Sequence, residues 1–97
     1  MSAQLARPNP RFNLGHVVAT PGAIEVLGKV NCLPITLLNR HQCGDWGDLC
    51  DADKAANNEA LGNWDRLFSA YIVQDVKFWV ITEADRSVTT ILLPEEY

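Results

Sequence analysis

The fold is decided by three runs near the end of the chain: RLFSAYIV at residues 66–73, VKFWVIT at residues 76–82 and SVTTILL at residues 87–93. Each run is rich in β-branched and aromatic residues. Short polar breaks separate the runs, a pattern typical of an antiparallel meander. We therefore predict a three-stranded antiparallel sheet over the last third of the chain.

The break at residues 74–75 sets the register of the first two strands. A tight turn there places Val73 opposite Val76 and Tyr71 opposite Phe78. With this register neither face of the ribbon alternates apolar with polar residues, as a half-solvated antiparallel sheet normally does. We expect helices to cover one face, which leaves the other partly apolar. A binding partner, a second copy of the chain or the N-terminal arm would then cover that second face.

The residues before the meander predict one short strand and three helices. The strand is expected over residues 14–19. Thr20 then suits the N-cap of a helix, and Pro21 suits its first position, whose N–H would have no partner in any case. The predicted helices run from Pro21 to Gly28, from Pro34 to about Gln42 and from about Asp51 to Leu61.

The second and third helices each carry an apolar stripe that should face the sheet. The stripe of the second helix follows the spacing of three to four residues that places side chains on one helical face. The stripe of the third helix consists of small residues, which allow close packing. The two stripes are Ile35, Leu37, Leu38 and His41 in the second helix, and Ala52, Ala55, Ala56 and Ala60 in the third.

These elements predict an α+β fold with one sheet of three to four strands covered by helices. The first strand is expected to join the meander. Residues 1–13 hold Pro8 and Pro10 with little periodicity, so we expect an extended or flexible N-terminal arm there. Residues 14–97 are predicted to form a single domain, since a chain of this length is close to the usual domain size.

Length and charge narrow the functional classes. The chain has 97 residues and a formal net charge of −4. No run approaches the roughly 20 apolar residues of a membrane span. The first residues lack the apolar core of a secretion signal, so we expect a cytoplasmic protein. Direct binding to duplex DNA is not expected, because it depends on Lys and Arg side chains that neutralise phosphates.

The acidity is concentrated in one segment. Residues 45–65 hold six acids and a single lysine, whereas residues 1–44 have a net charge of +3. Together with Trp46 and a predicted hairpin tip at residues 82–87, these acids form a candidate surface for a basic protein partner. The candidate partner-binding residues are Asp45, Trp46, Asp48, Asp51, Asp53, Glu83, Asp85 and Arg86.

A catalytic alternative uses His41 at the end of the second helix. Asp45 would orient the imidazole, and Arg86 would stabilise developing charge, as in a small metal-independent hydrolase or nuclease. A histidine at a helix C-terminus tends to be stabilised as the cation, which suits an acid better than a base. Whether the chain is an enzyme stays open at this point, and a binding role is favoured.

The three cysteines allow a metal hypothesis, which we do not favour. Cys32, His41, Cys43 and Cys50 offer ligand types that zinc accepts. Their spacing lacks the paired C-x2-C knuckles of known structural zinc sites. Ordinary free thiols are the simpler interpretation, and no cofactor is predicted.

Four short motifs are specific when they are taken together: VATPGA at residues 18–23, GDWG at 44–47, ITEADRS at 81–87 and LLPEEY at 92–97. They resemble a group of small uncharacterised proteins carried by bacterial plasmids, prophages and other mobile elements. The resemblance covers roughly residues 14–97 and implies a setting of counter-defence or plasmid maintenance, with no established activity to carry over. The chain departs from that group at Leu33 and Cys50, where the resembling proteins tend to carry a serine and an acid.

We therefore interpret the chain as a non-enzymatic, acidic protein-interaction module. The resemblance makes an inhibitor of a bacterial defence complex, of the anti-CRISPR or anti-restriction type, its expected role. Two alternatives stay open: the small hydrolase or nuclease that uses His41, Asp45 and Arg86, and an antitoxin-like or homodimeric structural protein.

Overall fold

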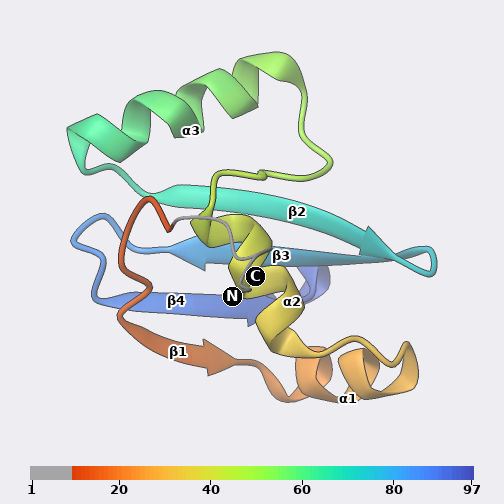
Figure 1. The fold of residues 1–97 in the computed structure, drawn as a ribbon. Helices are drawn as coiled ribbons and strands as arrows, with labels where there is room; N and C mark the ends of the chain where they lie inside the picture. Colours follow the sequence, from red (N-terminus) through yellow and green to blue (C-terminus); the bar gives the residue numbers. More distant parts are fainter. Residues whose placement is uncertain (1–9) are drawn as a thin grey trace, which may run out of the picture.

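The computed structural model describes residues 10–97 and confirms the predicted α+β fold (Figure 1). A single sheet contains four strands in the order β1-β4-β3-β2. The first strand joins the meander by pairing in parallel with β4, whereas the other two pairings are antiparallel. The elements are β1 (His16–Ala19), α1 (Pro21–Lys29), α2 (Pro34–Gln42), α3 (Asp51–Asn63), β2 (Leu67–Val73), β3 (Val76–Thr82), β4 (Val88–Leu92) and the 3-10 turn η1 (Pro94–Glu96).

The β2–β3 hairpin has the predicted register. Val73 lies opposite Val76 and Tyr71 opposite Phe78. The turn residues, Gln74 and Asp75, both have positive φ angles, of 50° and 67°. Positive φ at both central residues is the geometry of a type I′ turn, whose twist matches that of the strands it connects. The local turn and the apolar faces therefore specify the same pairing.

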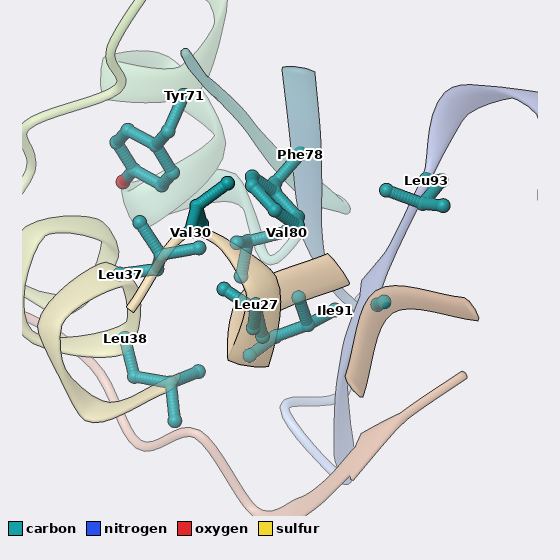
Figure 2. Packing of buried hydrophobic residues seen from close by; sticks show 10 residues of the cluster. Leu27, Val30, Leu37, Leu38, Tyr71, Phe78, Val80, Ile91 and Leu93 are labelled. Atoms are coloured by element: carbon teal, nitrogen blue, oxygen red, sulfur yellow. The ribbon is translucent and has the colours of Figure 1, made fainter. Parts of the chain in front are cut away.

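The main core lies between the sheet and the first two helices. In Figure 2, Leu27 of α1 lies near Ile91 of β4, and Leu37 of α2 lies near Tyr71 of β2. Thr20 caps α1, because its hydroxyl oxygen accepts a hydrogen bond from the N–H of Ala23 over 3.2 Å. Burying each large apolar side chain contributes roughly 1.5–3 kcal/mol, so this layer supplies most of the drive for folding.

The predicted helix stripes are correct for most of α2 and wrong for most of α3. Leu37, Leu38 and His41 are buried, but Ile35, in the first turn of α2, is 53% exposed. In α3 only Ala60 of the four predicted alanines is buried, and Asn57 is buried instead. The reason is the placement of α3, which lies along the outer edge of β2 rather than over a face of the sheet (Figure 1).

The outer edge of β2 is closed by groups of its own chain. The side-chain amide of Asn57 donates to the backbone oxygen of Phe68 over 2.7 Å, and its oxygen accepts from the N–H of Phe68 over 3.1 Å. Two residues further along, the N–H of Ala70 donates to the oxygen of Trp46, and its oxygen accepts from the N–H of Asp48. These contacts satisfy backbone groups that an edge strand would otherwise offer to another chain.

Replacing Asn57 should therefore destabilise the protein measurably. We expect Asn57→Ala to lower the free energy of unfolding by about 1–2 kcal/mol, because both backbone groups of Phe68 lose their partner. Urea unfolding followed by circular dichroism measures the change. Asn63→Ala, the same substitution at an exposed position of α3, is the matched control and should change the value by less than about 0.5 kcal/mol. Equal effects from the two substitutions would contradict the role given to Asn57.

The N-terminal arm is described only in part. Residues 1–9 of the predicted arm lie outside the described residues. Residues 11–13 follow an irregular path against α2, where the N–H of Arg11 donates to the oxygen of Gln42 over 2.8 Å. The Phe12 ring lies 5.2 Å from the imidazole of His41. Within residues 10–97, no helix has the length and apolar character needed to cross a membrane.

The face of the sheet opposite α1 and α2 is apolar. Phe68 and Trp79 lie there edge to face, with ring centroids 5.0 Å apart, and Ile72 is 50% exposed. The segment η1 and the following Tyr97 contact one end of this face, where the Tyr97 ring lies 5.7 Å from that of Trp79. A pocket of about 290 Å³ opens beside them.

Candidate functional site

All six acids of residues 45–65 are exposed. We call them the acidic surface. Asp51 and Asp53 occupy the first turn of α3, where their charge complements the positive end of the helix dipole. The acidic surface consists of Asp45, Asp48, Asp51, Asp53, Glu59 and Asp65.

Only two of these acids form ion pairs within the described residues. Arg40 Nε lies 2.6 Å from Asp45 Oδ2, and Lys77 Nζ lies 3.9 Å from Asp48 Oδ2. The hydrogen bond from Arg40 lowers the pKa of Asp45 below its usual value. No ion pair among residues 10–97 involves the other four acids. Four of the six carboxylates are therefore exposed and without an ion pair among residues 10–97.

Trp46, which the sequence placed on the candidate partner surface, lies inside the protein. It is 3% exposed, packs with Ala60 and Leu67, and donates its Nε1–H to Asn58 Oδ1 over 3.0 Å. The close approach of residues 46–48 to β2 depends on Gly47, whose φ is 79°. A side chain there would collide with the backbone oxygen of Ala70. Trp46 therefore anchors the loop before α3 rather than a partner.

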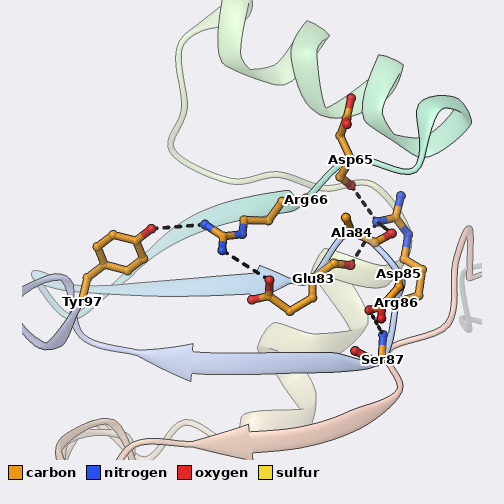
Figure 3. A network of polar contacts seen from close by, with 8 residues as sticks. All are labelled: Asp65, Arg66, Glu83, Ala84, Asp85, Arg86, Ser87 and Tyr97. Carbon is orange, nitrogen blue, oxygen red and sulfur yellow. Dashed lines mark hydrogen bonds and ion pairs between the residues drawn. The ribbon is translucent and has the colours of Figure 1, made fainter.

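The hairpin tip between β3 and β4 holds two exposed or half-exposed acids (Figure 3). Glu83 Oε1 lies 3.3 Å from Arg66 Nη2, and the same guanidinium donates to the hydroxyl of Tyr97 over 3.2 Å. Asp85 Oδ1 accepts from the N–H of Ser87 over 3.0 Å. Hydrogen bonds from Ser87 lower the pKa of Asp85 and fix its orientation in the turn.

Arg86 does not project from this tip but is 7% exposed. Its Nη1 donates to the backbone oxygens of Asp65, Ala84 and Glu83 over 2.7, 3.0 and 3.2 Å, and its Nη2 donates to that of Ala60 over 2.9 Å. The oxygen of Ala60 belongs to the last turn of α3, where a cation is favourable. Arg86 therefore joins the end of α3 to the hairpin.

His41 is the centre of a buried chain of hydrogen bonds. Nδ1 lies 2.6 Å from the Ser69 hydroxyl and Nε2 lies 2.9 Å from that of Thr82, which in turn lies 2.7 Å from that of Thr89. Thr89 donates to the backbone oxygen of Leu14 over 2.7 Å. Because that oxygen can only accept, each hydroxyl donates toward it, so Nε2 carries the proton and Nδ1 accepts from Ser69.

The three residues of the catalytic alternative are not joined to one another. Both ring nitrogens of His41 are occupied by hydroxyls, and the carboxylate of Asp45 is held by Arg40. Burial, and secondarily the charge of Arg86, lower the pKa of His41 to about 3, so its imidazole is neutral near pH 7. Among His41, Asp45 and Arg86, no two side chains are therefore hydrogen-bonded to each other, as the catalytic alternative requires.

The cysteines do not gather with other ligand types. Cys32 and Cys43 are half-buried, Cys50 is exposed, and all three are free thiols. The Sγ of Cys43 donates to the backbone oxygen of Arg40 over 3.4 Å. Between residues 10 and 97, no group of three or more His, Cys, Asp or Glu side chains is placed to hold a metal ion.

The polar residues that surround His41 inside the fold were not predicted from the sequence. Ser69, Thr82 and Thr89 are fully buried on the helix-covered face of the sheet, where they surround His41. Their signal was available: Ser69 and Thr82 interrupt that face of the predicted β2–β3 ribbon, and three small hydroxyls near one another need a shared partner when buried. Asn57 gave no comparable signal.

Of the predicted partner-binding residues, the acids of the acidic surface and of the hairpin tip lie at the protein surface. Their placement comes from α3, from the loop that Trp46 anchors and from the hairpin that Arg86 holds. No protein-family model, curated protein or solved structure matches the chain.

Proposed function

We propose that this chain is a non-enzymatic protein-interaction module whose acidic surface binds a basic surface of a partner protein. The observation that carries the proposal is the exposure of all six acids, four of which have no ion pair among residues 10–97. Concentrated like charge opposes compact folding through self-repulsion, so its presence on one segment favours a role in recognition.

Charge complementarity of this kind acts mainly on specificity and on the rate of association. Asp51 and Asp53 are held by a regular helix turn, so a partner would meet them without ordering a flexible loop. The proposed binding surface also includes Glu83 and Asp85 at the hairpin tip. Trp46 and Arg86 are buried, and the proposed surface does not include them.

The resemblance to mobile-element proteins suggests the class of partner. Restriction and CRISPR effectors carry basic channels because they bind the phosphates of nucleic acids. An acidic surface would occupy such a channel or its mouth and so inhibit the complex. An inhibitor of a bacterial defence complex is therefore the role we propose.

A homodimer is the second candidate, favoured by the apolar sheet face. Ile72 and Trp79 lie on this face, and a second copy could cover them. Static light scattering at high protein concentration tests it, because a dimer doubles the scattering mass. A strict monomer would remove this candidate and leave the acidic surface unaffected.

Neutralising three acids at and just before the start of α3 should weaken partner binding. We expect the variant Asp48→Asn, Asp51→Asn, Asp53→Asn to recover roughly tenfold less of a specific partner than the parent protein does. Tagged proteins are used to capture partners from a bacterial host lysate, and quantitative mass spectrometry compares the recovered proteins. Thermal unfolding verifies that the variant remains folded.

The matched control removes the same charge elsewhere. Glu25→Gln, Asp75→Asn, Glu95→Gln changes three exposed acids outside residues 45–65. This control should recover the partner as the parent does. The proposal fails if both triple variants recover the same proteins in the same amounts.

A further inference from the structure

A concave site lies where the end of α3 meets the β3–β4 hairpin and residues 11–13. It is a pocket of about 280 Å³, and its walls include Arg11, Phe12, Trp64, Asp85 and Arg86. This volume is close to the lower limit of pockets that hold small organic ligands. Two of the pocket's seven lining residues are arginines, although the chain as a whole has a net charge of −4.

The guanidinium of Arg86 keeps donors for a ligand. A guanidinium has five N–H groups: one on Nε and two on each Nη. The backbone oxygens of Asp65, Glu83 and Ala84 take up Nη1, and that of Ala60 takes up one N–H of Nη2. Among residues 10–97, no acceptor is hydrogen-bonded to Nε–H or to the second N–H of Nη2.

The positive charge of Arg86 also lacks a contacting carboxylate. No ion pair within the described residues includes it, and the Asp65 carboxylate acts on it only as a nearby charge. Arg86 as a whole residue is 7% exposed, and its burial lowers the pKa of the guanidinium. A buried cation is expensive unless an anion or several hydrogen bonds compensate it, and here the backbone oxygens compensate only one side.

Trp64 adds a planar surface at the mouth of the pocket. Trp64 is 62% exposed, and the guanidinium carbon of Arg86 lies 5.2 Å from the centroid of its ring. Trp64 is also the C-cap of α3, with a φ of 58°. A left-handed conformation costs a bulky residue on the order of 1 kcal/mol, and glycine normally occupies such positions. An exposed ring in a strained conformation is typical of a functional position.

The remaining charges favour an anion. Arg11 supplies the second cation, and its side chain lies over Gly44 beside the pocket. Asp85 is the one acid in the lining, and its carboxylate accepts the N–H of Ser87. Guanidinium groups bind carboxylates and phosphates through paired N–H donors, and indole rings stack on planar rings.

We propose that this pocket binds a small carboxylate or phosphate that is attached to a planar ring. The anion would lie on Arg86 and Arg11, and the ring would stack on Trp64. The pocket shares Asp85 with the proposed partner surface, but the small-molecule probes below report on the pocket alone, so either proposal can fail without the other.

Benzoate and phenyl phosphate are the probes that test this site. Each should shift the Arg86 Nε–H signal in nitrogen-15 NMR spectra and change the tryptophan fluorescence, with saturation below about 10 mM. Benzamide, which lacks the charge, and inorganic phosphate, which lacks the ring, should bind at least about tenfold more weakly. Tighter binding of one probe than the other identifies the anion as carboxylate or phosphate.

Two variants measure separately how much the Trp64 ring and the Arg11 charge contribute to probe binding. Trp64→Gly suits the left-handed backbone and Arg11→Ala changes an exposed side chain, so both should fold. Each should weaken probe binding about tenfold, whereas Lys29→Ala, a lost cation elsewhere on the surface, should leave it unchanged. The proposal is overturned by the absence of a saturable shift, by equal binding of benzamide, or by unchanged binding in both variants.

Discussion

Lowering the pH from 7 to 5 should reduce the free energy of unfolding by roughly 2 kcal/mol, because His41 stays neutral in the folded protein. Its pKa is about 3 in the folded state against 6.5 for an ordinary histidine. Between these values the unfolded chain binds a proton that the folded protein excludes. Stability therefore falls as the pH falls through this window, by at most about 1.4 kcal/mol per pH unit.

Urea unfolding at pH 7, 6 and 5 measures this slope above the range in which most carboxylates titrate. His16 is exposed, so His16→Gln should retain the slope, whereas His41→Gln should lose most of it. NMR titration of the parent protein gives an independent reading and should show His41 unprotonated at pH 5. Protonation of His41 near pH 6.5 would contradict the buried chain of hydrogen bonds.

Replacement of Arg86 should be the most destabilising single substitution that we discuss. We expect Arg86→Met to lower the free energy of unfolding by roughly 3–4 kcal/mol. The substitution keeps much of the apolar stem but leaves the backbone oxygens of Asp65, Ala84, Glu83 and Ala60 without their donor. The end of α3 and the β3–β4 hairpin would lose the side chain that joins them.

Chemical denaturation of three variants tests this role. Arg66→Met removes an exposed guanidinium from an ion pair in the same region, and it should cost less than about 1 kcal/mol. Arg86→Lys should recover part of the loss, since an ammonium keeps the charge but cannot reach all four oxygens. If Arg86→Met costs no more than Arg66→Met, the buried contacts do not stabilise the fold.

Local signals were sufficient to predict most of the fold. Pro21 and Pro34 begin helices because proline suits the first helical position, and both predicted starts are confirmed. The register of β2 and β3 follows from residues 74–75 together with apolar faces. The parallel pairing of β1 with β4 could not be deduced in this way, because it joins residues more than 70 positions apart.

The buried face of α3 was not predictable from its own pattern. Its alanines are compatible with burial but do not require it, and the helix is positioned by Asn57 on the edge of β2. The alanine spacing indicates which residues share a side of the helix. It does not indicate whether that side meets a sheet face, a strand edge or solvent.

The sequence was sufficient to predict which acidic residues lie at the candidate site, but not which of its residues are buried. Asp51 and Asp53 lie where helix-start residues are expected, at the surface. Trp46 and Arg86 have side chains that suit partner binding, but long-range contacts place both inside the protein. Trp46 is buried because the adjacent Gly47 lies against Ala70 of β2. Arg86 is buried because it donates to backbone oxygens at the end of α3 and in the β3–β4 hairpin.

The proposed recognition by charge is tested most directly by the salt dependence of affinity. The partner recovered by the parent protein, but not by the variant Asp48→Asn, Asp51→Asn, Asp53→Asn, is titrated by calorimetry at about 50 mM and about 300 mM sodium chloride. The screening length of exposed charges falls from roughly 14 Å to roughly 6 Å over this range, so the dissociation constant should rise roughly tenfold or more. A dissociation constant that is the same at both concentrations would contradict binding through the acidic surface.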